Sequence, residues 1–400
     1  MADRVEPVTC PFDFSESLDF DPLFRQLMAL GPVVRVRLPY GEDAWLVTTF
    51  DGVKKVTTDP RYSRAAIVGL NYPRLTPEPI VSPESINVMD PPRSTRLRRL
   101  VTSAFTTHTV ERMRPAVQRV VDDLLLRMAE HGPPLDIARH LSEPLPHHTI
   151  CELLDIPSAD RAELQHKTHQ MLAIAPEARE TSARAKADLR AYFTDLATAR
   201  RRTPGSDLIS TLATAHDRGD RLTDQELAVM AVTLILSGHD TASCQISNIV
   251  YVLLTNPQLT ALLRDQPETL PRALEELLRI IPFRKGIGIP RVAMEDTELA
   301  GVPIRAGEFV HVSYLTANRD PAAFTSPDVL DPHRPPHPHM TFGWGGHRCL
   351  AAPLARTELE IAIRSLLDRF PRLALAVPAD ELRWDTRTIR RFPLELPVRW

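Results

Sequence analysis

One cysteine of the chain occupies a position that favours a thiolate. Cys349 follows a glycine-rich stretch, residues 342–348, and directly precedes a segment with a helical pattern. Unpaired backbone N–H groups and the positive end of a helix stabilise the thiolate form of a cysteine. Gly343, Gly345 and Gly346 allow the backbone before it to approach a flat ligand closely. A sulfur in this setting suits metal ligation or a nucleophilic reaction.

From the residues alone, Cys349 has three interpretations. A lone cysteine before a helix is most often a buried, structural residue. Axial ligation of haem is another interpretation, and the glycine-rich loop favours it. A zinc site is the third, although the irregular spacing of the nearby histidines matches structural zinc patterns poorly. These histidines are His333, His337, His339 and His347.

A second group of polar residues interrupts a long apolar segment. The stretch Ser-Gly-His-Asp-Thr at residues 237–241 lies near the middle of a predicted helix. A glycine permits local unwinding of a helix, and an acid beside a hydroxyl can transfer protons. Taken alone, the stretch is more often a glycine kink with polar residues that face solvent.

Two predicted helices must position these residues. Thr223 and Glu226 match a capping box, and the apolar segment after them ends at residues 256–257, an Asn-Pro pair. This pattern predicts a helix of about 30 residues, roughly 45 Å long. The last strong helix is predicted to begin near residue 350 and to continue to residue 369.

The rest of the pattern predicts a mainly α fold with small β-sheets. Residues 33–50 have the pattern of a hairpin, and residues 287–313 contain short strand-like pieces with Gly301 and Gly307 at turns. Residues 93–216 are predicted to form helices that prolines separate. These prolines are Pro115, Pro133, Pro134, Pro144, Pro146, Pro157, Pro176 and Pro204.

The composition is that of a globular protein with no nucleic-acid partner. The chain has 400 residues, 43% of them hydrophobic, which fits several domains or one unusually large core. Its 48 basic and 51 acidic residues give a net charge of −3, too little positive charge to hold a nucleic acid. Four cysteines suit a reducing compartment. The N-terminus has no apolar targeting segment, and no run of consecutive apolar residues approaches the roughly 20 that a membrane span needs. We therefore expect a cytoplasmic protein with no membrane anchor.

Residues 342–349 resemble the haem-binding signature of cytochrome P450 enzymes, F-G-x-G-x-H-x-C, and every specified position is filled. A nearby departure is Ala351, where a glycine is common. The resemblance spans nearly the whole chain and is to soluble bacterial members of the family. It implies the cytochrome P450 fold in a single large haem-containing domain over residues 1–400. Residues 33–50 and 287–313 would be its β-rich parts, and residues 90–285 and 318–370 its helical, haem-enclosing part.

The same resemblance implies haem b, iron protoporphyrin IX, as the cofactor. Cys349 would be the ligand of the iron, and Phe342 would shield its sulfur. Gly343 would belong to the cofactor-binding loop, and His347 would meet a haem propionate.

Further haem contacts come from elsewhere in the chain by this resemblance. Arg98 and Arg291 match the propionate-binding arginines of the family. Ser94 stands where the family usually has a histidine, so one haem contact is expected to be weaker, lost or replaced by water.

Two more family patterns are present. Gly238, Asp240 and Thr241 match A/G-G-x-D/E-T, with Ser237 in place of the common alanine. The resemblance makes Asp240 and Thr241 the catalytic residues that deliver protons to dioxygen, and it argues against a dedicated peroxide-using enzyme.

The other pattern is the structural E-x-x-R of the family. Glu276 and Arg279 match it, and Arg334 is the candidate partner. Without the resemblance, an i,i+3 pair of this kind is more often a solvated helix face.

The expected function is that of a haem-thiolate monooxygenase. It would insert one oxygen atom from O2, by hydroxylation or epoxidation, into a bulky apolar small molecule such as an intermediate of antibiotic biosynthesis. The chain has no flavin, dinucleotide or iron–sulfur fingerprint, so ferredoxin and an NAD(P)H-dependent ferredoxin reductase are the expected partners. Arg96, Arg99 and Arg348 are candidates for docking an acidic ferredoxin.

Two alternative functions remain open. One is a haem-thiolate enzyme that couples or rearranges its substrate without oxygen insertion. The other is a non-catalytic haem protein or a partner-activating scaffold, which would lack the thiolate or the proton relay. Substrate choice is expected to depend on residues 62–89, residues 160–195, the middle of the long helix and the segment after Arg279.

Overall fold

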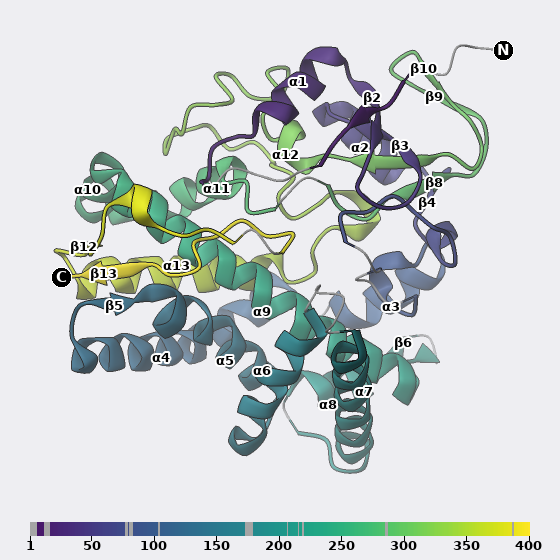
Figure 1. Cartoon of the computed structure of the whole chain (residues 1–400). Helices are drawn as coiled ribbons and strands as arrows, with labels where there is room; N and C mark the ends of the chain where they lie inside the picture. The colour runs from purple at the N-terminus through teal and green to yellow at the C-terminus, as the bar shows by residue number, and fades with distance from the viewer. Residues whose placement is uncertain are drawn as a thin grey trace. The chain divides into compact units, whose positions relative to one another are not determined.

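The computed structural model divides the chain into two compact units, each with its own core. The first unit is Met1–Thr95, Glu275–Cys349 and Thr386–Arg391, and the second is Arg96–Leu274, Leu350–Asp385 and Phe392–Trp400. Helices predominate over small sheets, as predicted (Figure 1). The structure describes residues 6–11, 17–76, 79, 83–102, 105–172, 179–205, 207–214, 216–217, 220–284, 287–385 and 388–400.

A sheet of six strands forms the centre of the first unit. Its order is β1 (Val8–Thr9), β2 (Val33–Arg37), β3 (Asp43–Val47), β11 (Phe309–Val312), β8 (Arg291–Ala293) and β4 (Tyr62–Ser63). Strands β2 and β3 form the predicted hairpin. Strand β11 pairs with β3 in parallel, which joins the two predicted β-rich segments in one sheet.

Both faces of this sheet are buried. Ala44 and Leu46 of β3 belong to one hydrophobic cluster, whereas Trp45 and Val47 belong to another. Because successive side chains of a strand point to opposite faces, the sheet is covered on both sides. The other elements of this unit are α1 (Pro22–Leu30), α2 (Phe50–Thr58), α12 (Tyr314–Ala317), the 3-10 turns η1 (Ala65–Ile67), η2 (Ile86–Val88) and η7 (Gly345–His347), and the hairpin of β9 (Thr297–Leu299) and β10 (Val302–Ile304).

The second unit is a bundle of helices around α9. Its main elements are α4 (Thr107–His131), η4 (Ala138–Ser142), α5 (Pro144–Leu153), α6 (Ser158–Leu172), α7 (Arg179–Arg202), α8 (Leu208–Thr214), α9 (Asp224–Thr255), α10 (Pro257–Asp265) and α13 (Ala352–Arg369). Helix α9 packs against α5, α7 and α13, and α13 lies beside α4 (Figure 1). Its small sheets are β12 (Ala374–Leu375), β13 (Pro397–Arg399) and β5 (Leu135–Asp136), and β6 (His216–Asp217) with β7 (Asp220–Arg221). Two further helices, α3 (Arg93–Thr102) and α11 (Leu270–Ile280), each have residues in both units.

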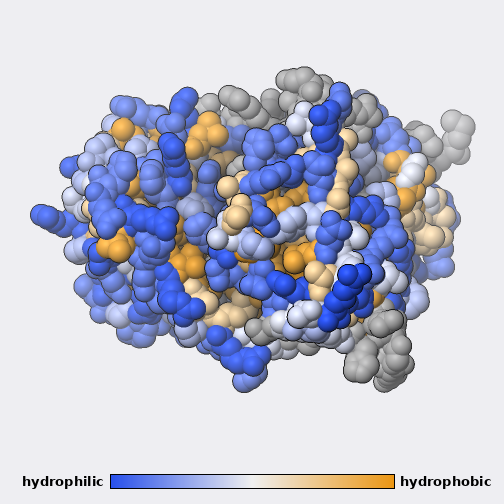
Figure 2. All heavy atoms as spheres, turned by 90° about the horizontal axis from the view of Figure 1, so that it is seen from below, coloured by the Kyte–Doolittle hydropathy of each residue, from blue (hydrophilic) through white to orange (hydrophobic). Residues whose placement is uncertain are grey.

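Helix α9 confirms the prediction of a long capped helix. It has 32 residues, and Thr223 and Glu226 form the complete capping box. By length and composition it is apolar enough to cross a membrane, but 61% of its most apolar window is buried inside the structure. This burial is typical of the core helix of a globular bundle. On the face shown in Figure 2, hydrophobic residues form small patches among hydrophilic ones.

One predicted helix break is wrong. Pro115 lies inside α4 and does not end that helix. A proline inside a helix removes one hydrogen bond and costs about 3 kcal/mol. Pro115 faces solvent, whereas buried residues on the opposite side of the 25-residue helix, such as Val117 and Val121, stabilise it through tertiary packing.

Candidate functional site

The segment before Cys349 is a closed loop. The Cys349 N–H donates to the Phe342 carbonyl at 2.7 Å, and the Gly343 N–H donates to the Met340 carbonyl at 2.8 Å. Gly343 has a φ of +73° and so uses backbone space that other residues rarely adopt. Cys349 itself is exposed, whereas Cys10, Cys151 and Cys244 are buried. The interpretation of Cys349 as a buried structural cysteine is therefore wrong.

Gly345 fixes this loop against α2. Its φ is +67°, and a Cβ atom there would lie 2.2 Å from the carbonyl oxygen of Thr57. The loop backbone therefore touches the end of α2 directly. Gly346, the next residue, has no atom within 4 Å of such a Cβ position. Only the first of these two glycines is required by packing.

Asn318 holds the chain immediately before the loop. Its Oδ1 accepts from the Met340 N–H at 2.7 Å, and its Nδ2 donates to Thr341 Oγ1 at 2.9 Å. The hydroxyl of Thr341 in turn donates to the Leu278 carbonyl of α11 at 2.6 Å. Two residues that precede Phe342 are thereby tied to α11 and to the chain after α12.

The predicted contact of Glu276, Arg279 and Arg334 is confirmed. Glu276 Oε2 lies 2.7 Å from Arg279 Nε and 3.0 Å from Arg334 Nε. Glu276 and Arg279 are only 4% and 3% exposed, so this is not the solvated pair that spacing alone suggests. Arg279 also donates to the Asn318 carbonyl at 2.7 Å. The ion pair is therefore connected to the residue that holds the Cys349 loop.

The zinc interpretation is contradicted. His339 Nε2 lies 3.1 Å from Glu275 Oε2, and the His337 ring packs against Phe50 and Phe324. His347 lies half-buried in η7. Within the described ranges, no group of three or more His, Cys, Asp or Glu side chains is placed to hold a metal ion.

Arg291 offers buried donors that fit an anionic cofactor group. It begins β8, is 2% exposed, and neither of its terminal nitrogens has a hydrogen-bond partner among the described residues. A buried guanidinium normally has an acceptor for these groups. A haem propionate is such an acceptor, so Arg291 and the exposed sulfur of Cys349 fit this cofactor. Arg98 lies half-buried on α3, and Ser94 is buried near the start of the same helix.

Asp240 and Thr241 lie on an unbroken helix. Helix α9 continues through residues 237–241, so the local unwinding that Gly238 would permit does not occur there. The Thr241 hydroxyl donates to the Ser237 carbonyl at 2.9 Å. This bond uses the proton of the Thr241 hydroxyl and leaves its lone pairs as acceptors.

A buried acid on α13 was not singled out by sequence reasoning. Glu358 is 4% exposed, and burial raises its pKa to about 8, while a hydrogen bond with Thr149 of α5 opposes that rise. The carboxyl group is therefore protonated at neutral pH. Leu354 and Ala362 lie four residues before and after Glu358, so the three side chains share the apolar face of the helix. This spacing is the sequence pattern that could have indicated the burial of Glu358.

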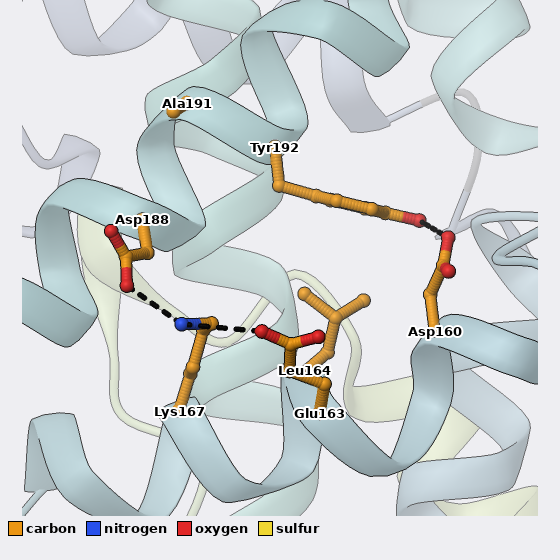
Figure 3. A pocket seen from close by; sticks show the side chains of 7 residues that line it. All are labelled: Asp160, Glu163, Leu164, Lys167, Asp188, Ala191 and Tyr192. Carbon is orange, nitrogen blue, oxygen red and sulfur yellow. Dashed lines mark hydrogen bonds and ion pairs between the residues drawn. The ribbon is translucent and has the colours of Figure 1, made fainter.

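An open groove of about 320 Å³ lies between α6 and α7. Lys167 is paired there with Glu163 and Asp188, and the Tyr192 hydroxyl donates to Asp160 at 2.8 Å (Figure 3). The groove contains none of the predicted site residues. Its cation already has two acidic partners, so the groove is not a second anion site.

The segments expected to govern substrate choice differ in burial. Ile67 and Val88 belong to the hydrophobic core of the first unit, and Ile287 and Ile289 pack against it. Val68 and Leu70 are instead about half exposed, at 45% and 48%. Ile174 and Lys285, which belong to two of these segments, lie outside the described residues.

Comparisons with known proteins find relatives over nearly the whole chain. The family model for cytochrome P450 matches residues 162–378. Nocardicin C N-oxygenase from Nocardia uniformis subsp. tsuyamanensis is 45% identical over 99% of the chain and 100% of its own length. Mycinamicin IV hydroxylase/epoxidase from Micromonospora griseorubida is 42% identical over 99% of each chain. Among solved structures, cytochrome P450mel 107F1 with biaryl coupling reactivity is 57% identical, with a TM-score of 0.95, and the match covers 99% of this chain and 100% of the other.

Proposed function

Because the chain belongs to the cytochrome P450 family and is a P450 monooxygenase, we propose that it inserts one oxygen atom from O2 into a bulky apolar small molecule, by hydroxylation or epoxidation. The observation that carries this proposal is the exposed Cys349 on its closed glycine loop, combined with Asp240 and Thr241 on α9. A scaffold that only activates a partner would not need this thiol and this acid–alcohol pair.

The residues that would hold haem b are those of the Cys349 loop together with the buried cations. Cys349 would bind the iron, Phe342 would shield the sulfur, Gly343 would belong to the cofactor-binding loop, and His347 would contact a propionate. Arg291 and Arg98 would neutralise propionate charge. When bound, a haem with a thiolate ligand supplies the oxidising chemistry, because the thiolate pushes electron density toward the iron and favours O–O cleavage.

Asp240 and Thr241 would deliver the protons that the reaction consumes. The Thr241 hydroxyl donates to the Ser237 carbonyl, so its lone pairs accept a hydrogen bond from water or substrate. Asp240, one residue earlier on the same helix, would exchange protons with solvent. This assignment rests on residue type and on position along α9.

The proposed substrate is a natural-product intermediate. Curated relatives at 45% and 42% identity are an N-oxygenase of nocardicin C and a hydroxylase/epoxidase of mycinamicin IV. The two enzymes have different named substrates and carry out different named reactions. The proposal is therefore limited to a bulky small molecule of antibiotic-type biosynthesis.

Oxidative coupling of aromatic rings is the second candidate. The structural relative with biaryl coupling reactivity is 57% identical, which is higher than either curated oxygenase named above. Coupling would use the same haem-binding residues without placing an oxygen atom in the product. The substrate would then be a phenol or a similar electron-rich ring.

We also propose external electron donors and a cytoplasmic location. Ferredoxin and an NAD(P)H-dependent ferredoxin reductase would supply two electrons per turnover. Arg99 and Arg348 are exposed and suit an acidic partner, and the third candidate, Arg96, is less exposed and lies 2.6 Å from Glu226. Residues 1–400 would act as a single haem-containing domain.

Spectra and isotope labelling test this function. The reduced protein with CO should give the red-shifted Soret band of thiolate ligation, and Cys349→Ser should keep the fold but lose both this band and turnover. Cys10→Ser, at a buried cysteine, is the matched control. Under 18O2, a product that is heavier by one labelled oxygen supports insertion. An unlabelled dimer formed from a naphthol probe would favour coupling, and turnover by Cys349→Ser would refute both.

A further inference from the structure

Arg64 and Arg291 lie side by side at the ends of two paired strands. Strand β4 is antiparallel to β8, and Ser63 lies opposite Val292. The next residue in this register, Arg64, is opposite Arg291, and side chains opposite each other project from the same face of a sheet. Arg64 is 7% exposed and Arg291 is 2% exposed. Two guanidinium groups are therefore buried together.

Several nitrogens of this pair have no acceptor among the described residues. Arg64 Nη1 donates to the Asn87 carbonyl at 3.0 Å, but Arg64 Nε and both terminal nitrogens of Arg291 have no hydrogen-bond partner there. The acid that acts on Arg64 is Asp90, whose carboxylate accepts from the backbone N–H groups of Arg64 and Ala65 at 3.0 and 3.2 Å. The carboxylate also accepts from the Ser63 hydroxyl. Asp90 therefore holds the backbone turn and does not neutralise the second guanidinium.

His311, which is also titratable and lies near both arginines, does not supply negative charge. His311 is fully buried, and its Nε2 donates to the Pro73 carbonyl at 3.1 Å. Burial, with the nearby Arg291 and Arg64 as further causes, lowers the pKa of His311 to about 3, so it is neutral at pH 7. Burial and then Arg291 lower the pKa of Arg64 to about 9. The cluster has an excess of positive charge that calls for an anion.

We propose that Arg64 binds a haem propionate together with Arg291, and that it supplies the contact that Ser94 is too short to make. This inference rests on the proposed function, since the anion is part of the haem. Ser94 is buried, and its N–H donates to the Asp90 carbonyl at 3.0 Å. Asp90 thus connects Ser94 to Arg64. A guanidinium presents a planar fork that matches a carboxylate, whereas a serine offers one short hydroxyl.

Haem loss from the purified holoenzyme tests this role. Arg64→Met removes the charge and keeps an apolar stem, and it should speed transfer of haem to an apomyoglobin acceptor at least tenfold. With iron protoporphyrin IX dimethyl ester, which has no propionate charge, the wild type and Arg64→Met should lose the cofactor at the same rate. Ser94→His in the Arg64→Met background should restore haem retention to within about threefold of the wild type.

Arg61→Met is the matched control. Arg61 is three residues earlier, is 42% exposed at its side chain and pairs with Asp59, so its loss should leave haem retention unchanged. Resonance Raman of the ferric enzyme gives a second readout, because the propionate bending band should shift in Arg64→Lys and not in Arg61→Met. An unshifted band, or equal acceleration of loss for both porphyrins, would overturn the proposal. A protein that takes up no haem would instead refute the proposed function.

Discussion

Arg334 Nε lies 3.0 Å from Glu276 Oε2, and both side chains are largely shielded from solvent. Arg279, on the same helix as Glu276, also pairs with this carboxylate, with its Nε 2.7 Å from Oε2. One carboxylate therefore pairs with two buried guanidiniums, and both of these arginines donate to the Val329 carbonyl. The ion pairs connect α11 to the chain that leads to the Cys349 loop.

Replacement of Glu276 by glutamine should destabilise the protein strongly. The change leaves Arg279 and Arg334 buried without a counter-charge, and breaking a buried pair in this way costs about 3–5 kcal/mol. Urea denaturation followed by circular dichroism measures the loss. Glu111→Gln is the control, because Glu111 pairs with Arg114 at an exposed i,i+3 position and should change stability by less than about 1 kcal/mol. Equal effects of the two substitutions would contradict this account.

The two adjacent loop glycines should respond differently to alanine. Gly345→Ala places a Cβ atom 2.2 Å from the Thr57 carbonyl at a φ of +67°, so either the loop or α2 must move. We expect lower stability and a several-fold lower haem content, measured by the pyridine haemochrome assay. Gly346→Ala meets nothing within 4 Å and should behave like the wild type. A Gly345→Ala protein with full haem content would show that the contact with α2 is dispensable.

The local elements of this chain could be predicted, because their signals lie within a few residues. Thr223 and Glu226, three residues apart, indicate where α9 begins, and the glycines before Cys349 indicate its role. The i,i+3 spacing of Glu276 and Arg279 also predicts that the two side chains are in contact. Their burial could not be predicted, because it depends on a part of the chain that lies 58 residues after Glu276.

The long-range relations could not be read from the sequence. Strand β11 pairs with β3 across more than 250 residues, and no local pattern indicates that parallel pairing. Arg64 and Arg291 become neighbours only through the pairing of β4 with β8. Pro115 misled the helix prediction because a local breaker rule takes no account of the tertiary packing of α4.

Glu358 should make the stability of the protein fall as the pH rises. Its pKa is raised from 4.5 to about 8 by burial, so between these values the folded protein holds a proton that the unfolded chain has released. The contribution of Glu358 to the free energy of unfolding is greatest below about pH 4.5. It decreases as the pH rises toward 8, by up to about 1.4 kcal/mol per pH unit.

Glu358→Gln should remove this dependence. The neutral amide has nearly the same shape, so the variant should gain stability relative to the wild type between pH 5 and pH 8. Urea midpoints at both pH values measure the difference. Glu360→Gln, at the partner of Arg114 two residues later, should keep the pH dependence of the wild type. Parallel pH profiles for the wild type and Glu358→Gln would mean that the acid is ionised in the folded protein.

Thr241→Ala should uncouple electron consumption from product formation. The substitution removes a hydroxyl whose lone pairs are available because its proton is donated to the Ser237 carbonyl at 2.9 Å. Proton delivery then depends on water alone, so we expect several-fold less product per NAD(P)H and more hydrogen peroxide. Thr255→Ala is the matched control, since Thr255 makes the same bond to the Tyr251 carbonyl at 2.8 Å but lies about 21 Å further along α9. If Thr241→Ala and Thr255→Ala give the same ratio of product to NAD(P)H as the wild type, Thr241 has no part in the relay, and Asp240 must act through water.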